Sequence, residues 1–252
     1  MNVLRSIGVG LLGMMLVGLV GCGSNPAAKI NQNAPTGTGM KLKTARINGG
    51  DVKYSVFIPH GYRSEQQWPT IVFLHGIGEA GSSGTAPTTV GLGPQIAKDP
   101  GNFNFIVVFP QVSGSWAAPE KQDRVVEVLD DVAKQYSIDP ERVYLTGLST
   151  GGQGVWLTGA RHRNRFAALV PMCGYDAMDA VPGLTDIPIW CFHNSGDWAV
   201  GAGDSRRMVE AIKAAGNPHI KYTQYSAFGH DVWIKAFNDP ELYRWMLQQR
   251  RR

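Results

Sequence analysis

Short apolar runs alternate with longer amphipathic stretches along most of this 252-residue chain. The first two runs, Leu42–Ile47 and Val52–Ile58, flank Asn48-Gly49-Gly50, which is typical of a tight hairpin turn and predicts an antiparallel strand pair. Later apolar runs predict six more strands: Thr70–Leu74, Phe105–Phe109, Val143–Leu145, Phe166–Pro171, Ile187–Phe192 and Ile220–Tyr225. Helical patterns separate the later strands, at Asp123–Tyr136, Gly152–Arg163, Asp204–Ala215 and Glu241–Arg250. The alternation predicts an α/β fold with a mostly parallel, doubly wound sheet and antiparallel N-terminal strands.

The N-terminal 21 residues have the pattern of a secretory signal peptide. Arg5 is the only charged residue in Met1–Gly21, and the apolar stretch Ile7–Val20 is too short for a typical membrane span. Leu19-Val20-Gly21-Cys22 resembles a bacterial lipobox, in which cleavage before the cysteine leaves a residue that is lipidated on sulfur and nitrogen. More than one acyl chain would anchor the protein stably in a membrane. An ordinary secretory signal with a chance cysteine is the alternative.

A single domain is expected to follow this signal. Residues 22–39 have little apolar content and much Pro, Gly and Asn, so we expect the lipidated cysteine and a flexible tether there. Residues 40–252 have the usual size of one domain, with no repeat. Only a short stretch separates Cys173 from the strand that begins at Ile187, which leaves no room for a helical cap domain.

The cysteines and the net charge bear on whether the protein has a disulfide, a metal site or a nucleic-acid partner. Besides Cys22 the chain has Cys173 and Cys191, which could pair in an oxidising compartment or remain buried free thiols. No Cys/His spacing matches a zinc site, so we expect no metal. The net charge is +4, and the arginine clusters do not resemble a nucleic-acid reader. The oligomeric state stays open.

The most informative motif is Gly147-Leu148-Ser149-Thr150-Gly151, which has the form G-x-S-x-G and follows the strand-like run Arg142–Thr146. A serine at a sharp strand-to-helix turn projects its hydroxyl from the sheet, and the small flanking residues let the two backbone segments approach closely. The motif therefore predicts that Ser149 is a nucleophile. The alternative is a glycine-rich turn with an incidental serine.

A serine hydroxyl needs a histidine base and an acid to react at neutral pH. The usual chain order for such an elbow is Ser, Asp or Glu, then His, each after a later strand. Asp197 follows the strand Ile187–Phe192 and is the predicted acid; His230 follows the last strand and is the predicted base. Asp176 is the second choice for the acid, and His193 is expected to pack locally.

Acyl transfer also requires donors for the oxyanion of the tetrahedral intermediate. One donor comes from the backbone N–H after the nucleophile, which here is Thr150. The second is expected in the loop after Thr70–Leu74, where the N–H of Ile77 lies between two glycines. His75 is then expected to hold this loop in place.

As a set, these motifs resemble one group of the α/β-hydrolase superfamily: the bacterial predicted esterases related to dienelactone hydrolases, phospholipase/carboxylesterases and feruloyl esterases, often labelled prolyl-oligopeptidase-like. The segments that carry the resemblance are Leu74–Gly81, Arg142–Trp156, Phe166–Gly174, Ile187–Asp197 and Gly229–Trp233. The resemblance implies hydrolysis of carboxylic esters without a cofactor, through Ser149, Asp197 and His230. Two positions depart from it: Asn194 where many relatives have Gly, and Thr150 where Met or Gln is commoner.

The expected substrates are short-acyl or aryl esters, such as acetyl or feruloyl groups on plant polysaccharide. Trp116, Trp198 and Trp233 are expected on loops beside the site, where they would form an aromatic wall or only pack the loops. A serine peptidase is the alternative activity, and a non-catalytic binding lipoprotein is the alternative class. The expected location is the bacterial cell envelope, at the outer membrane if the host has one.

Overall fold

The computed structural model describes residues 25–251 of the chain. The predicted signal peptide, residues 1–21, and the predicted lipidation site Cys22 lie outside the described residues. Within residues 25–251, no helix combines the length and the apolar character that crossing a bilayer requires.

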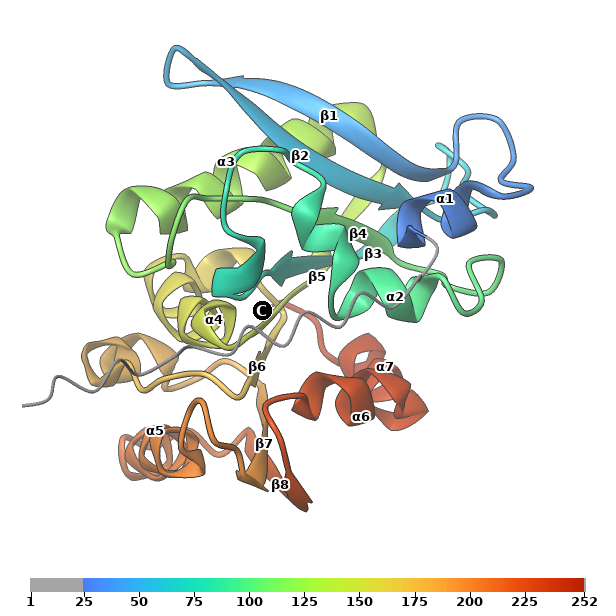
Figure 1. The fold of residues 1–252 in the computed structure, drawn as a ribbon. Helices are drawn as coiled ribbons and strands as arrows, with labels where there is room; N and C mark the ends of the chain where they lie inside the picture. Colours follow the sequence, from blue (N-terminus) through green and yellow to red (C-terminus); the bar gives the residue numbers. More distant parts are fainter. Residues whose placement is uncertain (1–24, 252) are drawn as a thin grey trace, which may run out of the picture.

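An eight-stranded sheet forms the centre of the molecule, with the strand order β1-β2-β4-β3-β5-β6-β7-β8 (Figure 1). The β1–β2 hairpin and the β2–β4 pair are antiparallel, and the remaining neighbours are parallel. This arrangement confirms the predicted fold class. The strands are β1 (Gly39–Ile47), β2 (Gly50–Ile58), β3 (Trp68–Leu74), β4 (Ile106–Phe109), β5 (Ile138–Leu148), β6 (Ala168–Met172), β7 (Ile189–Gly196) and β8 (Ile220–Phe228).

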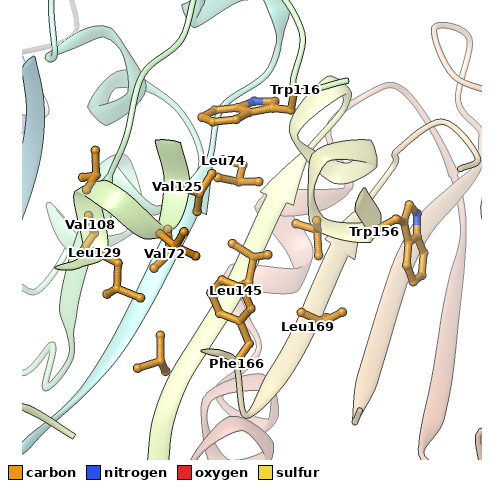
Figure 2. Close-up of a cluster of buried hydrophobic side chains, with 14 of the residues drawn as sticks. Val72, Leu74, Val108, Trp116, Val125, Leu129, Leu145, Trp156, Phe166 and Leu169 are labelled. Carbon is orange, nitrogen blue, oxygen red and sulfur yellow. The ribbon is translucent and has the colours of Figure 1, made fainter. Parts of the chain in front are cut away.

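Helices cover both faces of this sheet because both faces of its central strands are apolar. On β3, Val72 and Leu74 belong to the core on one face, whereas Ile71 and Phe73 belong to the core on the other. Helices α3, α4 and α5 contribute to the first core, part of which is drawn in Figure 2. Helices α1, α2, α6 and α7 contribute to the second core (Figure 1). The helices are α1 (Pro26–Asn31), α2 (Leu92–Ile96), α3 (Pro119–Gln135), α4 (Thr150–Arg161), α5 (Ala202–Ala214), α6 (Val232–Asn238) and α7 (Pro240–Gln248), with 3₁₀ turns η1 (Ile77–Glu79), η2 (Ala86–Thr89), η3 (Arg163–Arg165) and η4 (Met178–Leu184).

The prediction of a flexible tether over residues 22–39 is wrong for Pro26–Asn31. Pro26–Asn31 forms helix α1, which starts at a proline and is capped by the Asn25 side chain. Ile30 of α1 is fully buried in the second core, which also contains residues of α2, α6 and α7. The Asn31 side chain exchanges two hydrogen bonds with the Met40 backbone, at 2.6 and 2.9 Å. The folded body therefore begins before residue 40.

No element was predicted between Leu74 and Phe105, but this part of the chain contains η1, η2 and α2. A second helix that the periodicity did not reveal is α6, which begins two residues after His230 and includes Trp233. Trp233 therefore lies on a helix and not on a loop, which corrects the prediction. Each of these helices is too short for a repeating apolar pattern to identify it from sequence.

Candidate active site

Ser149 lies at a sharp turn between β5 and α4, as the G-x-S-x-G motif predicts. Its backbone is in a strained region, with φ 56° and ψ −122°, which non-glycine residues rarely adopt. The turn is tight enough that a β-carbon on Gly151 would lie 2.2 Å from the Leu74 carbonyl oxygen, and one on Gly147 would lie 2.5 Å from the Gly151 carbonyl oxygen. Only glycine fits at these two positions, so the close approach of β3, β5 and α4 depends on them.

Asp197 and His230 meet at the carboxyl ends of β7 and β8. His230 Nδ1 lies 2.7 Å from Asp197 Oδ2, and the Asp197 side chain is fully buried. Asp197 Oδ1 accepts hydrogen bonds from the backbone N–H groups of Ala199 and Val200, at 2.9 and 3.0 Å. The carboxylate is therefore fixed on both oxygens, and it holds the imidazole with its second nitrogen, Nε2, free.

The elbow and the Asp197–His230 pair are linked through the end of β6. The Ser149 N–H donates to the Met172 carbonyl at 3.0 Å, and Cys173 is the next residue. The Cys173 thiol lies with Asp197 and His230 in a cluster whose potential ligand atoms are within 4.8 Å of one another. Because Asp197 and His230 already form a hydrogen bond with each other, we interpret the cluster as this hydrogen-bonded pair with a neighbouring thiol and not as a metal site. Cys173 and Cys191 are both buried free thiols.

His193 is fully buried and forms local hydrogen bonds beside the acid, as expected. Its Nε2 donates to the Val200 carbonyl at 2.9 Å and lies 3.4 Å from Asp197 Oδ2, while Nδ1 accepts from the Ser205 hydroxyl at 2.7 Å. Burial is the main cause that lowers the pKa of His193, so its imidazole stays neutral. His193 thus anchors the loop that carries Asp197.

The second choice for the acid, Asp176, does not reach His230. Its carboxylate instead binds the guanidinium of Arg207, at 2.6 and 3.0 Å, on the surface beside α5. Asp231, three residues before Ile234, accepts from the Asn194 side chain at 2.9 Å. Neither carboxylate competes with Asp197 for the histidine.

The two predicted oxyanion donors are equivalent in their local structure. Ile77 is the first residue of the turn η1, and Thr150 is the first residue of α4. A backbone N–H at the start of a helix has no partner within that helix. Within residues 25–251, neither N–H finds a partner elsewhere. Both are therefore free to bind an anionic oxygen beside Ser149.

A buried hydrogen-bond network holds the loop that carries Ile77. His75 Nδ1 donates to the Gly76 carbonyl at 2.6 Å, and Nε2 accepts from the Val112 N–H at 3.2 Å. Burial lowers the pKa of His75, which is consistent with a neutral ring in these two roles. Gln111 also holds the loop, since its Nε2 donates to the Glu79 carbonyl at 2.7 Å. Nothing in the sequence marks Gln111, because its role depends on a contact across 32 residues.

Glu79 is a residue of the site that the sequence reasoning missed. It is partly buried at the end of η1, and burial is the main cause that raises the pKa of its carboxyl. The backbone N–H groups of Gly76 and of Glu79 itself act in the opposite direction. Its position matches the glutamate of a capping box, since Gly76 precedes the turn and Glu79 is its third residue, but Gly76 has no side chain to complete the box.

The prediction of an aromatic wall is wrong for Trp116. Its side chain is 0% exposed and belongs to the buried cluster that includes Leu74 (Figure 2). The indole Nε1 donates to the His75 carbonyl at 3.0 Å, and the two rings are 4.9 Å apart. By contrast, Trp198 is 72% exposed, and the ring centroids of Trp198 and Trp233 lie 6.4 and 5.6 Å from that of His230. Two of the three tryptophans therefore flank the candidate base.

Comparisons with known proteins agree on this architecture. The model of the prolyl oligopeptidase family matches residues 109–189. A bifunctional acetylxylan esterase/xylanase from Neocallimastix patriciarum is 31% identical over 98 residues, which are 37% of this chain and 15% of that protein. Feruloyl esterase D from Neurospora crassa is 23% identical over 198 residues, 75% of this chain and 64% of that protein.

Solved structures include a thermostable esterase with a TM-score of 0.74 and 27% identity, over 84% of this chain and 63% of that one. The chain thus spans less than two thirds of each of these three proteins. The esterase structure aligns over most of the sheet and the helices described above, so the likeness extends beyond the elbow motif.

Proposed function

We propose that this chain, which has the α/β-hydrolase fold and is related to esterases of that superfamily, is a serine hydrolase that cleaves carboxylic esters. The observation that carries the proposal is the 2.7 Å hydrogen bond between His230 and the buried Asp197, at the same sheet edge as the strained elbow of Ser149. In a catalytic triad, the histidine activates the serine hydroxyl as a nucleophile, and the carboxylate orients the histidine.

In the proposed reaction, the Ser149 hydroxyl attacks the ester carbonyl carbon, and His230 Nε2 takes the hydroxyl proton. Asp197 holds the ring in the required tautomer, because Nδ1–H donates to its carboxylate. The N–H groups of Ile77 and Thr150 bind the carbonyl oxygen as it becomes anionic. One such donor is typically worth about 2.7–4 kcal/mol of transition-state stabilisation.

Collapse of the tetrahedral intermediate breaks the bond to the alcohol, which leaves with the proton held by His230. The acyl group is then attached to Ser149 Oγ. Water, deprotonated by His230, attacks this acyl-enzyme, and the serine oxygen leaves with the proton returned by the imidazole. The buried, doubly fixed carboxylate of Asp197 keeps the imidazole oriented through both halves.

The proposed substrates are short-acyl or aryl esters, including acetyl and feruloyl groups carried by polysaccharide. Support comes from the names of two relatives, an acetylxylan esterase/xylanase and a feruloyl esterase. Trp198 and Trp233, whose rings both lie near that of His230, provide apolar surface for an aryl acyl group or a sugar ring.

A peptidase is the second candidate, because the prolyl oligopeptidase family model matches residues 109–189, which include the elbow. The same three residues would then cleave an amide. Amide hydrolysis would be measured with peptidyl p-nitroanilides under the conditions that are used for the esters. Turnover of the anilides at rates comparable with ester turnover would favour the peptidase.

We also propose that the protein is exported and anchored by lipid on Cys22, on the basis of the lipobox-like segment Leu19–Cys22. Metabolic labelling with palmitate in a bacterial host tests this proposal. The wild-type chain should incorporate label and fractionate with membranes, and Cys22→Ser should do neither. Label in both proteins, or in neither, would contradict anchoring at this cysteine.

The experiment that tests the activity is hydrolysis of p-nitrophenyl acetate, butyrate, octanoate and ferulate by residues 25–252, beside the Ser149→Ala variant. We expect activity that falls with acyl length, with ferulate retained, and no activity above background in the variant. A fluorophosphonate probe should label only the wild type at Ser149. Absence of both labelling and turnover would favour a non-catalytic binding protein.

A further inference from the structure

Glu79 places a negative charge without a counter-ion beside the candidate nucleophile. Within residues 25–251 the carboxylate forms no salt bridge, and no positive side chain contributes to the shift of its pKa. The carboxylate of the candidate acid differs in this respect, since the buried Asp197 binds His230. A charge that is partly removed from water and has no cation to neutralise it affects every charged group nearby.

The position of this carboxylate is fixed by the turn that precedes it. Gly76 precedes η1, and Glu79 is the third residue of the turn, the spacing at which an acidic side chain folds back onto the N–H before the turn. Glu79 Oε2 lies 3.4 Å, and Ser149 Cβ lies 3.5 Å, from the point where a β-carbon on Gly76 would be. Adding these two distances gives an upper limit for the separation of the carboxylate oxygen from the serine. The carboxylate therefore lies close to Ser149, the residue that would carry the acyl group in the proposed reaction.

We infer that Glu79 is a specificity-determining residue of this site: its carboxylate disfavours substrates with an anionic acyl or alcohol group and speeds the release of the carboxylate product. This inference rests on the proposed esterase function. When water has displaced Ser149 from the acyl group, the free acid gives up its proton to solvent and becomes an anion. That anion then lies next to Glu79, and like charges at this range repel.

A purely structural role, in which Glu79 only caps the turn, predicts a different outcome. Replacement by Gln keeps an oxygen that can accept from the Gly76 N–H and removes the charge, since both Glu and Gln serve in this position. Replacement by Ala removes the cap and the charge. Glu65→Gln is the matched control, because it removes one charge from an exposed carboxylate in the connection between β2 and β3.

The test compares two p-nitrophenyl esters of similar acyl length, the neutral valerate and the anionic hemiglutarate. We expect the kcat/KM ratio, valerate over hemiglutarate, to fall about tenfold in Glu79→Gln and to stay at the wild-type value in Glu65→Gln. The inhibition constant for valerate anion should also decrease several-fold in Glu79→Gln. Equal ratios in wild type and Glu79→Gln would overturn the inference, and so would a change confined to Glu79→Ala, which would assign Glu79 to the cap alone.

A second measurement separates this inference from the proposed function. Two alkyl fluorophosphonates, one neutral and one ending in a carboxylate, are reacted with wild type and Glu79→Gln, and adducts at Ser149 are followed by intact mass. The charge effect predicts that the anionic probe gains more than the neutral probe in the variant, even if no ester is turned over. Unchanged relative rates would overturn the inference. Labelling by neither probe would refute the serine hydrolase itself and the inference with it.

Discussion

Replacement of tryptophan by phenylalanine can be compared at a buried position, Trp116, and at an exposed position, Trp198. Both are tryptophans of segments that follow strands near the site, but Trp116 is 0% exposed and Trp198 is 72% exposed. Tryptophan to phenylalanine removes the indole N–H and part of the ring while the residue stays aromatic. The matched pair therefore separates a buried support of the oxyanion loop from a residue available to substrate.

The magnitude at position 116 follows from what the indole contacts. Its N–H donates to the buried His75 carbonyl at 3.0 Å, and loss of a partner for a buried polar group costs about 1–3 kcal/mol. The smaller ring leaves a void, and a void of methyl size costs about 1 kcal/mol more. We expect Trp116→Phe to lower the free energy of unfolding by about 2–4 kcal/mol. Trp198→Phe should change it by less than about 0.5 kcal/mol, as at most exposed positions.

The two substitutions should also change different kinetic parameters. Because His75 is two residues before Ile77, Trp116→Phe should loosen the oxyanion donor and lower kcat on every ester, with KM nearly unchanged; a misplacement of 1 Å can cost about 100-fold. Trp198→Phe should alter KM for aryl esters and leave kcat on acetate unchanged. Urea unfolding and steady-state kinetics on p-nitrophenyl acetate and ferulate measure both effects. A stable Trp116→Phe protein with a defect only on ferulate would refute the assignment of Trp116 to the core.

Three further outcomes are expected. Asp197→Asn should lower kcat by about 10⁴-fold at neutral pH, because the imidazole loses its orientation, and wild-type kcat would contradict the role of Asp197. Gly151→Ala should reduce both the melting temperature and activity, since its β-carbon would lie 2.2 Å from the Leu74 carbonyl oxygen; calorimetry that shows no change would refute the tight elbow. The free energy of unfolding should decrease as the pH falls below about 6.5, by up to about 1.4 kcal/mol per unit for each of His75 and His193. Their folded-state pKa values are lowered, so the unfolded chain takes up protons first, and flat urea midpoints between pH 7 and 5 would contradict this.

The fold class and the positions of the strands follow from local features of the sequence. The Asn48-Gly49 turn forms with positive φ at both residues, 50° and 78°, as the hairpin requires. The last predicted strand, Ile220–Tyr225, lies within β8 (Ile220–Phe228). Such features succeed because turn chemistry and apolar periodicity depend on residues only a few positions apart.

The candidate site was predictable to the extent that each residue lies next to a recognisable strand. Ser149, Asp197 and His230 each follow a strand of one parallel run, so the sheet places them at a common edge. Their catalytic roles stay a prediction. Helices α1, α2 and α6 were not found, because five to seven residues are too few to establish a helical period.

The sequence by itself determined the order of the elements, the tight elbow and the identity of the chemical groups, because all of these are encoded by neighbouring residues. Only the tertiary structure decided that Trp116 is buried, that Ile30 packs into the core, and that the carboxylate of Glu79 lies beside Ser149. Burial and proximity of this kind arise when segments far apart in the chain pack together, and no local pattern contains that information.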